Sequence, residues 1–367
     1  MGAVVTHPAV ASVAAVGLVE PSGSPLRIAD LAWPGFLTAC EDHRILGLLP
    51  VALRAGTLEL ADYQRENLEL LLRRWLSHDL VVERMAQRVG LVLSERGIDY
   101  RLLKGVVLAN LVYPDPSMRV FSDVDVLVAA DSFSAAASAI AERLGATRAL
   151  PELRPGFDDR FGREILLRSG EVEIDLHRTL VDGPVGLRIP LRELFERPGS
   201  VTVGDQELRT VNAEAQFLHA CISAVLGEWP PRLMVLRDVM ELLRSEQASV
   251  AADPSRVLEA AARWRATSVV ALALRRAESD LGVRVDHPLG DWARRFRPSR
   301  VDRLVLRTYR GRARGYTSQL ASVIAIDGWA DRSEYLRAIV RPDRAYLAAR
   351  GFRRGERIRR AVGLVRD

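Results

Sequence analysis

Two aspartates, Asp123 and Asp125, lie two residues apart in the otherwise apolar stretch Ser122–Val128. Side chains alternate between the two faces of a β-strand, so both carboxylates would share one face while Val124 and Val126 point into a core. Two clustered carboxylates repel each other unless a cation lies between them. Oxygen ligands at this spacing suit Mg²⁺, which binds one or two carboxylates together with substrate phosphates. Asp-Val-Asp alone could equally be two acids that face water.

A second stretch of the same type, Glu171–His177, follows about fifty residues later. Its acids and His177 alternate onto one face, and its aliphatic residues take the other. If this strand lies beside the first, Asp175 completes a site of three carboxylates, which can hold two metal ions for phosphoryl transfer. The spacing does not establish that the strands are neighbours. His177 is a possible substrate contact or metal ligand, or a buried hydrogen-bonding residue.

Candidate phosphate contacts precede the acid pair. The segment Arg101–Gly105 predicts a strand that turns into a helix at Gly105, and backbone N–H groups at such a helix start favour phosphate. Lys104 would add a point charge that reaches triphosphate oxygens. Arg119 and Ser122 are further candidates for nucleotide binding, although Arg119 could simply balance the acidic strand.

Lys104 is also the only lysine among 52 basic residues, the others being arginines. Arginine replaces lysine easily on a solvated surface, but poorly where a compact ammonium must reach a defined point. The isolation of Lys104 therefore favours a functional role over chance survival.

The chain has a helical pattern, then a mixed α/β pattern, then helices again. Alternating apolar residues predict strands at 100–103, 124–128, 161–168 and 171–177, with a second hairpin around Gly204-Asp205. We expect four regions: a loose N-terminus (1–25), an N-terminal helical region (26–97), a mixed core (98–211), and a C-terminal helical region with a basic tail (212–367).

Composition excludes a disordered, collagenous or disulfide-rich protein, since 48% of the 367 residues are hydrophobic and two are cysteines, Cys40 and Cys221. The few cysteines favour a reducing cytoplasm, and no apolar run is long enough for a membrane span. The apolar stretch Ala9–Val19 has no basic residue before it, so we expect no secretory signal. Residues 291–367 contain 20 arginines against 8 acidic residues, a basic tail that could hold a polyanion or be a solvated helical face.

Several motifs in their order along the chain resemble the uncharacterised nucleotidyltransferase family of the polymerase-β-type superfamily. They are Leu-Lys-Gly (103–105), Tyr-Pro-Asp-Pro (113–116), Arg119, Asp-Val-Asp-Val-Leu-Val (123–128) and Asp-Leu-His (175–177). The likeness is strongest over residues 99–177. It departs from the wider superfamily at the phosphate-binding helix, where Lys104-Gly105 stands in place of the usual Gly-Ser pair.

The resemblance implies an α+β fold, with a small mixed β-sheet nucleotidyltransferase core flanked by N-terminal and C-terminal helical regions. It implies that Asp123, Asp125 and Asp175 bind Mg²⁺ (or Mn²⁺) and catalyse transfer of a nucleoside monophosphate from NTP, with Asp175 as the base for the acceptor. The acceptor could be a small molecule, a peptide or protein, or RNA. Two alternatives are a kinase-like phosphoryl transferase and a non-catalytic NTP-binding or regulatory protein on the same scaffold.

Overall fold

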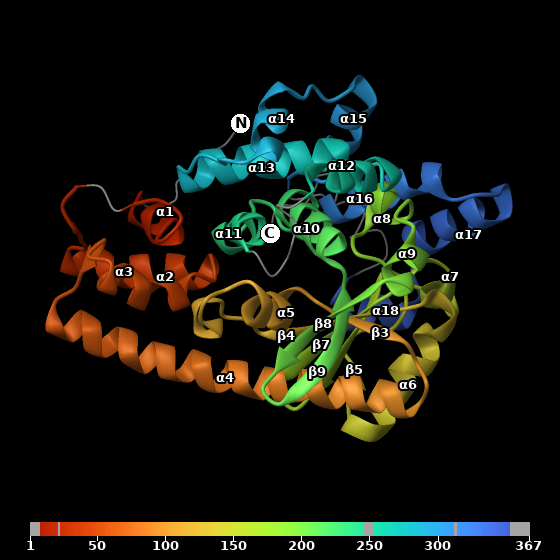
Figure 1. Cartoon of the computed structure of the whole chain (residues 1–367). Helices are drawn as coiled ribbons and strands as arrows, with labels where there is room; N and C mark the ends of the chain where they lie inside the picture. The colour runs from red at the N-terminus through yellow and green to blue at the C-terminus, as the bar shows by residue number, and fades with distance from the viewer. Residues whose placement is uncertain (1–7, 21–22, 246–252, 312–313, 353–367) are drawn as a thin grey trace.

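A seven-stranded mixed sheet lies at the centre of the molecule in the computed structural model, which describes residues 8–20, 23–245, 253–311 and 314–352 (Figure 1). From one edge to the other its strands are β5 (Thr147–Arg148), β6 (Glu164–Ser169), β7 (Val172–His177), β4 (Asp123–Val128), β3 (Tyr100–Leu103), β9 (Gln206–Val211) and β8 (Pro198–Val203). β4 is parallel to β7 and β3 is parallel to β9, whereas the other neighbouring strands are antiparallel. The small mixed sheet predicted from the sequence is therefore confirmed.

Helices surround the sheet. The N-terminal ones are α1 (Pro8–Ala14), α2 (Trp33–Asp42), α3 (Leu49–Arg54) and the long α4 (Asp62–Glu95). Those between the strands are α5 (Lys104–Leu111), α6 (Phe133–Leu144), α7 (Phe157–Phe161), α8 (Gly183–Gly186) and α9 (Leu191–Glu196). The C-terminal ones are α10 (Ala213–Ile222), α11 (Leu233–Arg244), α12 (Pro254–Arg263), α13 (Thr267–Leu281), α14 (Pro288–Arg295), α15 (Arg300–Thr308), α16 (Arg314–Ser322), α17 (Trp329–Val340) and α18 (Arg344–Ala349). A two-stranded parallel sheet, β1 (Leu26–Arg27) and β2 (Leu58–Glu59), joins two N-terminal segments.

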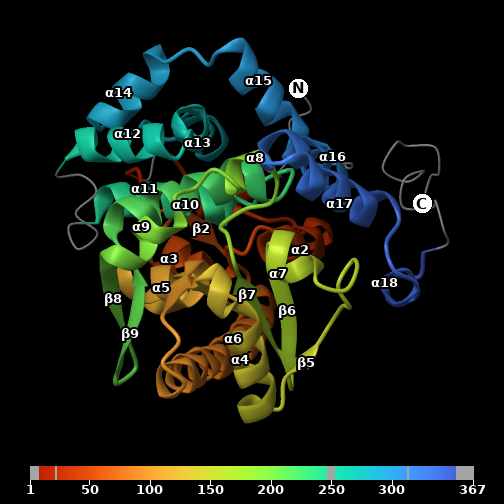
Figure 2. The ribbon, with the colours of Figure 1, turned by 90° about the vertical axis from the view of Figure 1, so that its right-hand side faces the viewer.

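The two faces of the sheet pack against different helices. On one face, α4 and α6 cover the alternating apolar residues of β4 and β7, among them Val124, Val126 and Ile174. The other face lies under α10 and α11, with α12 to α15 beyond them (Figure 2). The acids of β4 and β7 alternate with the buried aliphatic residues, so they face this second, C-terminal layer.

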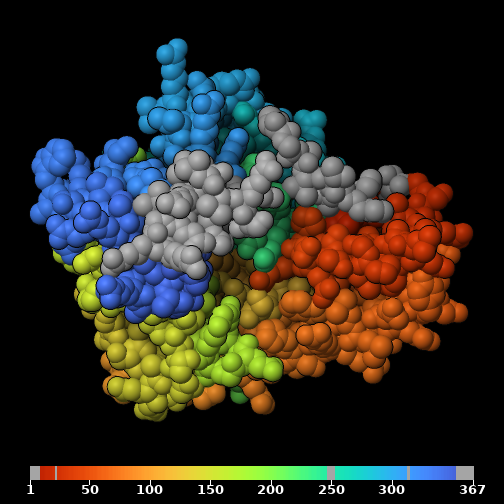
Figure 3. All heavy atoms as spheres, turned by 180° about the vertical axis from the view of Figure 1, so that it is seen from behind, coloured from red at the N-terminus to blue at the C-terminus, as the bar shows by residue number. Residues whose placement is uncertain are grey.

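Helices α1, α2 and α3 occupy one end of the molecule and α17 the other (Figure 1 and Figure 3). Val10 and Val13 of α1 are fully buried against α11 and α13. Arg237 Nη1 donates to the carbonyls of Ala14 and Val16 at 2.7 and 2.8 Å. This stretch therefore packs as part of the core rather than as a loose terminus. None of the helices in the described part of the chain combines the length and the apolarity that crossing a bilayer requires.

Asp79 of α4 fixes the chain just before β4. Its Oδ1 accepts a hydrogen bond from the Phe121 N–H at 3.1 Å, whereas its buried Oδ2 has no partner among the described residues. Burial raises the pKa of Asp79 to about 7, because a charged carboxylate is poorly solvated there.

We expect the substitution Asp79→Asn to stabilise the protein in a pH-dependent way. The folded-state pKa lies above the unfolded value, so Asp79 opposes folding increasingly as the pH rises from about 4 to 7, and by a constant amount above that. Asparagine keeps an acceptor for Phe121 without the charge, and should raise the free energy of unfolding at pH 8 by about 1 kcal/mol or more. Urea denaturation at pH 5 and pH 8 measures the difference, and an equal gain at both pH values would contradict the assignment.

Candidate active site

The register of β4 and β7 brings the two acidic motifs together. In this parallel pair Asp123 is opposite Glu173, Asp125 is opposite Asp175, and Leu127 is opposite His177. One oxygen each of Asp125 and Asp175 and a ring nitrogen of His177 lie within 4.8 Å of one another. The structure therefore answers the question that the spacing left open, since the strand with Asp175 does lie beside the strand with Asp123 and Asp125.

Asp125 is buried and held from two sides. Its Oδ1 accepts hydrogen bonds from Lys104 Nζ at 2.9 Å and from His177 Nε2 at 2.7 Å. Burial alone would raise the pKa of Asp125, but the Lys104 ammonium and the His177 bond hold it well below its usual range. These contacts favour the charged carboxylate. Both bonds use Oδ1, so Oδ2 takes part in neither.

Asp175 carries negative charge that its neighbours do not balance. Burial, together with the nearby charges of Asp125 and Glu164, raises the pKa of its carboxyl to about 6. A cation between Asp125 and Asp175 would remove this repulsion, and carboxylate oxygens are the ligands that Mg²⁺ prefers. Asp123 lies at the rim, where its Oδ1 is 3.7 Å from Arg44 Nη1.

Lys104 reaches Asp125 from an unusual backbone conformation. It begins α5 with a φ of +46°, a region that non-glycine residues seldom adopt and that is often associated with functional sites. Gly105, the next residue, packs so closely on Phe121 that an added Cβ would lie 3.0 Å from the Phe121 Cβ. The glycine therefore lets the start of α5 approach β4, and this approach brings the lysine to the acids.

Arg119 lies in a buried ion pair. Its Nε and Nη2 donate to the two oxygens of Asp238 on α11 at 2.8 and 2.9 Å, and Tyr113 Oη donates to Asp238 Oδ1 at 2.8 Å. Arg119 thus uses its fork on a protein carboxylate, tying the loop before β4 to the C-terminal helices. Ser122 is half-buried directly before Asp123.

A cavity of about 350 Å³ opens beside these acids. Its lining includes Lys104, Asp123 and Asp175 from the core, and Tyr309 and Ser318 from the C-terminal helical region. The C-terminal helices therefore complete the cavity and do more than cover the sheet.

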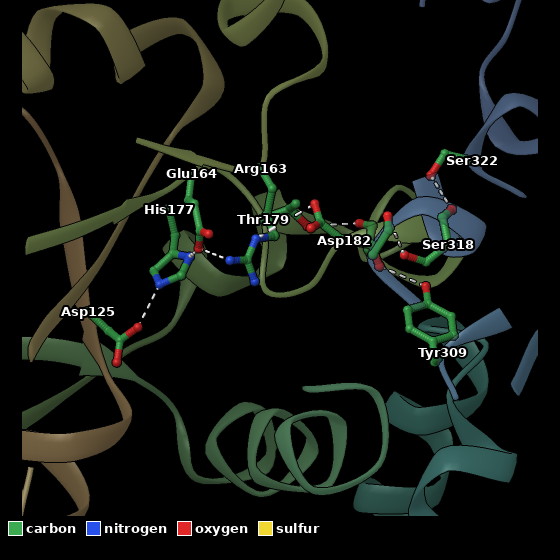
Figure 4. A network of polar contacts seen from close by, with 11 residues as sticks. Asp125, Arg163, Glu164, His177, Thr179, Asp182, Tyr309, Ser318 and Ser322 are labelled. Atoms are coloured by element: carbon green, nitrogen blue, oxygen red, sulfur yellow. Dashed lines mark hydrogen bonds and ion pairs between the residues drawn. The ribbon is translucent and has the colours of Figure 1, made fainter. Parts of the chain in front are cut away.

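A chain of polar contacts links the acids to these helices (Figure 4). Glu164 Oε2 lies 3.5 Å from His177 Nδ1 and forms an ion pair with Arg163. Arg163 Nε is 3.7 Å from Asp182 Oδ1, and the carbonyl of Asp182 accepts a hydrogen bond from Tyr309 Oη at 2.7 Å.

Sequence reasoning missed four charged residues of this region: Arg44, Arg163, Glu164 and Asp182. None of them stands in a spacing pattern with the acids. Glu164 begins β6, opposite His177 of β7, and Arg163 comes directly before it, so only the strand pairing brings them to the site.

Comparison with known proteins identifies the family. The sequence profile described as uncharacterised nucleotidyltransferase matches residues 29–282, more than half of the chain. The chain belongs to this family. The protein is accordingly a transferase that acts on nucleotides, as the resemblance in the motifs predicted. No curated protein matches.

Solved structures of other nucleotidyltransferases show a distant likeness. The solution structure of the antibiotic-resistance factor ANT(2'')-Ia is 15% identical, with a TM-score of 0.36, and the match covers 51% of this nucleotidyltransferase and 92% of that chain. A crystal structure of ANT(2'')-Ia with adenylyl-2''-tobramycin is 14% identical, with a TM-score of 0.34, and covers 50% and 96%. An antigenic nucleotidyltransferase-like protein from Paracoccidioides brasiliensis is 16% identical, with a TM-score of 0.31, and covers 56% and 92%.

The Arg119–Asp238 pair predicts a large loss of stability when one partner is removed. Asp238→Ala should lower the free energy of unfolding of this nucleotidyltransferase by about 3–5 kcal/mol, because it leaves a buried guanidinium without a counter-charge. The double variant Arg119→Met with Asp238→Leu should recover most of the loss. Urea denaturation of the three proteins tests this, and a single variant within about 1 kcal/mol of wild type would show that the pair is not buried in solution.

Proposed function

We propose that this protein transfers a nucleoside monophosphate from an NTP to an acceptor, in a site where Asp123, Asp125 and Asp175 bind Mg²⁺. The observation that carries the proposal is the register of β4 and β7, which sets Asp125 opposite Asp175 with ligand atoms within 4.8 Å. Family membership supports nucleotidyl transfer over a kinase-like reaction at the same acids.

The donor set fits a hard divalent cation. Oxygens from Asp125 and Asp175 suit Mg²⁺, whereas the His177 nitrogen is a poorer Mg²⁺ ligand and would be better accepted by Mn²⁺. His177 already bonds to Asp125 Oδ1, so we assign it to orienting that carboxylate. When bound, the metal would neutralise phosphate charge and polarise the reacting phosphoryl group.

The chain's own residues then have separate tasks. Lys104 carries the cation nearest the acids and lines the cavity, so its ammonium would contact the triphosphate. Gly105 would let the N-terminus of α5 approach the phosphates, and Ser122 would contact the nucleotide from the loop before β4. Asp175 lines the same cavity and would accept the proton of the attacking acceptor group.

Arg119 would act indirectly. Because its fork is bound to Asp238, we assign it to holding the loop before β4 in place rather than to direct phosphate binding.

Replacing either of the strand β4 acids should stop the reaction. We expect Asp125→Asn and Asp123→Asn to lower the rate of transfer by at least about a hundredfold, because each removes metal-binding charge while keeping shape. The assay incubates the protein with Mg²⁺, host lysate fractions and NTP labelled at the α-phosphate, and follows which species gains label. Asp205→Asn, in the exposed turn between β8 and β9, is the matched control and should match wild type.

The position of the label distinguishes the reactions. Nucleotidyl transfer moves the α-label, whereas a kinase moves only a γ-label. Substantial Mg²⁺-dependent transfer by both β4 variants would refute the metal site.

Lys104 should matter for its shape as well as its charge. A hydrogen bond to a charged phosphate contributes about 1.5–3 kcal/mol, so Lys104→Ala should raise the KM for NTP or lower kcat about tenfold or more. Lys104→Arg keeps the charge, but its planar fork cannot place a compact cation 2.9 Å from Asp125 in the same way, and turnover should still fall. Steady-state kinetics on NTP measures both, and an arginine variant equal to wild type would show that charge alone suffices.

A further inference from the structure

A second cavity, of about 260 Å³, is lined by residues of α13 and α15 and of the loop between α14 and α15. Figure 2 shows where these helices lie. Four arginines line it, namely Arg275, Arg303, Arg307 and Arg310. Apolar side chains such as Leu272 and Leu306 make up much of the remaining lining, and the lining contains no aspartate or glutamate.

Within the described ranges, none of the four arginines takes part in a salt bridge. The Asp302 carboxylate interacts electrostatically with Arg303 without forming one. Arg275 donates to the main-chain carbonyls of Ala293 and Phe296, and Arg303 Nη1 donates to the carbonyl of Pro298 at 2.7 Å. These bonds orient the guanidinium groups but leave their charge in place.

The remaining two arginines face the cavity from the end of α15. Arg310 lies over the Trp229 ring at 5.5 Å, and for Arg307 the described residues provide no hydrogen-bond or ion-pair partner. The nearest acid in sequence, Asp302, bonds to Ser299 at the start of α15 and to Ser268 of the cavity lining. Arg303 and Arg307 are at i and i+4 and so share one face of α15, and Arg310 comes two residues after the helix ends; all three line the cavity.

We propose that this arginine cavity binds a phosphate-bearing ligand at a site separate from the acidic cavity. The four guanidinium groups line the same cavity, so their charges repel each other, and an anion among them would remove the repulsion. The planar fork of arginine matches phosphate oxygens in pairs, and the apolar part of the lining would take a sugar or a ring attached to the phosphate.

The arginine cavity adjoins the acidic one. Tyr309 lines the acidic cavity, and the next residue, Arg310, lines the arginine cavity. In the same way Glu228 lines the acidic cavity, and the next residue, Trp229, contacts Arg310. The guanidinium carbon of Arg276 also lies over the Trp229 ring, 4.4 Å from its centroid. A bound phosphate would therefore contact the chain segments that complete the acidic cavity.

The test measures binding of two probes without NTP and in the presence of EDTA, so that it is independent of the metal site and of activity. The probes are inorganic pyrophosphate, by calorimetry, and a fluorescent 12-nucleotide single-stranded RNA, by anisotropy. The double variant Arg303→Gln with Arg307→Gln should weaken binding of at least one probe about tenfold or more. The salt dependence of binding should also become less steep.

The matched control is Arg84→Gln with Arg88→Gln, which removes two exposed arginines at the same i, i+4 spacing from α4, on the opposite side of the sheet. It should change either affinity less than about twofold. Arg307→Glu serves as a second test, because Arg307 is exposed and its reversal breaks no contact in the described residues.

If the cavity variants weaken the binding of both probes, the ligand is a small phosphate compound or a terminal phosphate. If only the binding of the RNA weakens, the ligand is a nucleic-acid backbone. Equal affinities of cavity variants, control and wild type, with unchanged thermal unfolding, would overturn the proposal.

Discussion

Two carboxylates on adjacent parallel strands, Asp125 and Asp175, are the constraint on which the rest of the site depends. Their register places them side by side, and like charges at such a distance oppose folding. Lys104 and His177 bond to Asp125, whereas at Asp175 burial and the charges of Asp125 and Glu164 still leave a raised pKa. The fold therefore holds an acidic site that a cation would stabilise, and it does so from the two central strands of the sheet, whose other face is fixed by α4 and α6.

Contacts from the surrounding elements hold the acids and Lys104 in place. The left-handed conformation of Lys104 and the close packing of Gly105 bring a single cation to Asp125. The buried Arg119–Asp238 pair joins the loop before β4 to α11, and Tyr309 joins α15 to the loop at Asp182. The C-terminal helices thus contribute residues to the acidic cavity. They also form a second, basic cavity between α13 and α15.

Local patterns in the sequence predicted the strands well. The alternation in 124–128 and 171–177 corresponds to β4 and β7, and the hairpin around Gly204-Asp205 is the β8–β9 hairpin, because period and turn residues are local properties. The family resemblance, carried by five short motifs, is confirmed by the profile match.

Long-range pairing could not be predicted in the same way. The partner of Arg119 is 119 residues away in the chain, and nothing in the local sequence of either residue indicates the other. Arg44, Arg163 and Asp182 reach the acids from a turn, a strand end and a loop, so their role depends on tertiary packing. The burial of Val10 and Val13 likewise depends on α11 and α13, which come more than 200 residues later.

The central claim is that Asp125 and Asp175 together bind a divalent cation. Anomalous diffraction from crystals of the full chain, grown with Mn²⁺ and a non-hydrolysable NTP analogue, tests it most directly. The account predicts an anomalous peak bonded to carboxylate oxygens of both Asp125 and Asp175, with the triphosphate beside Lys104. Bound nucleotide with no anomalous peak at either carboxylate would contradict it.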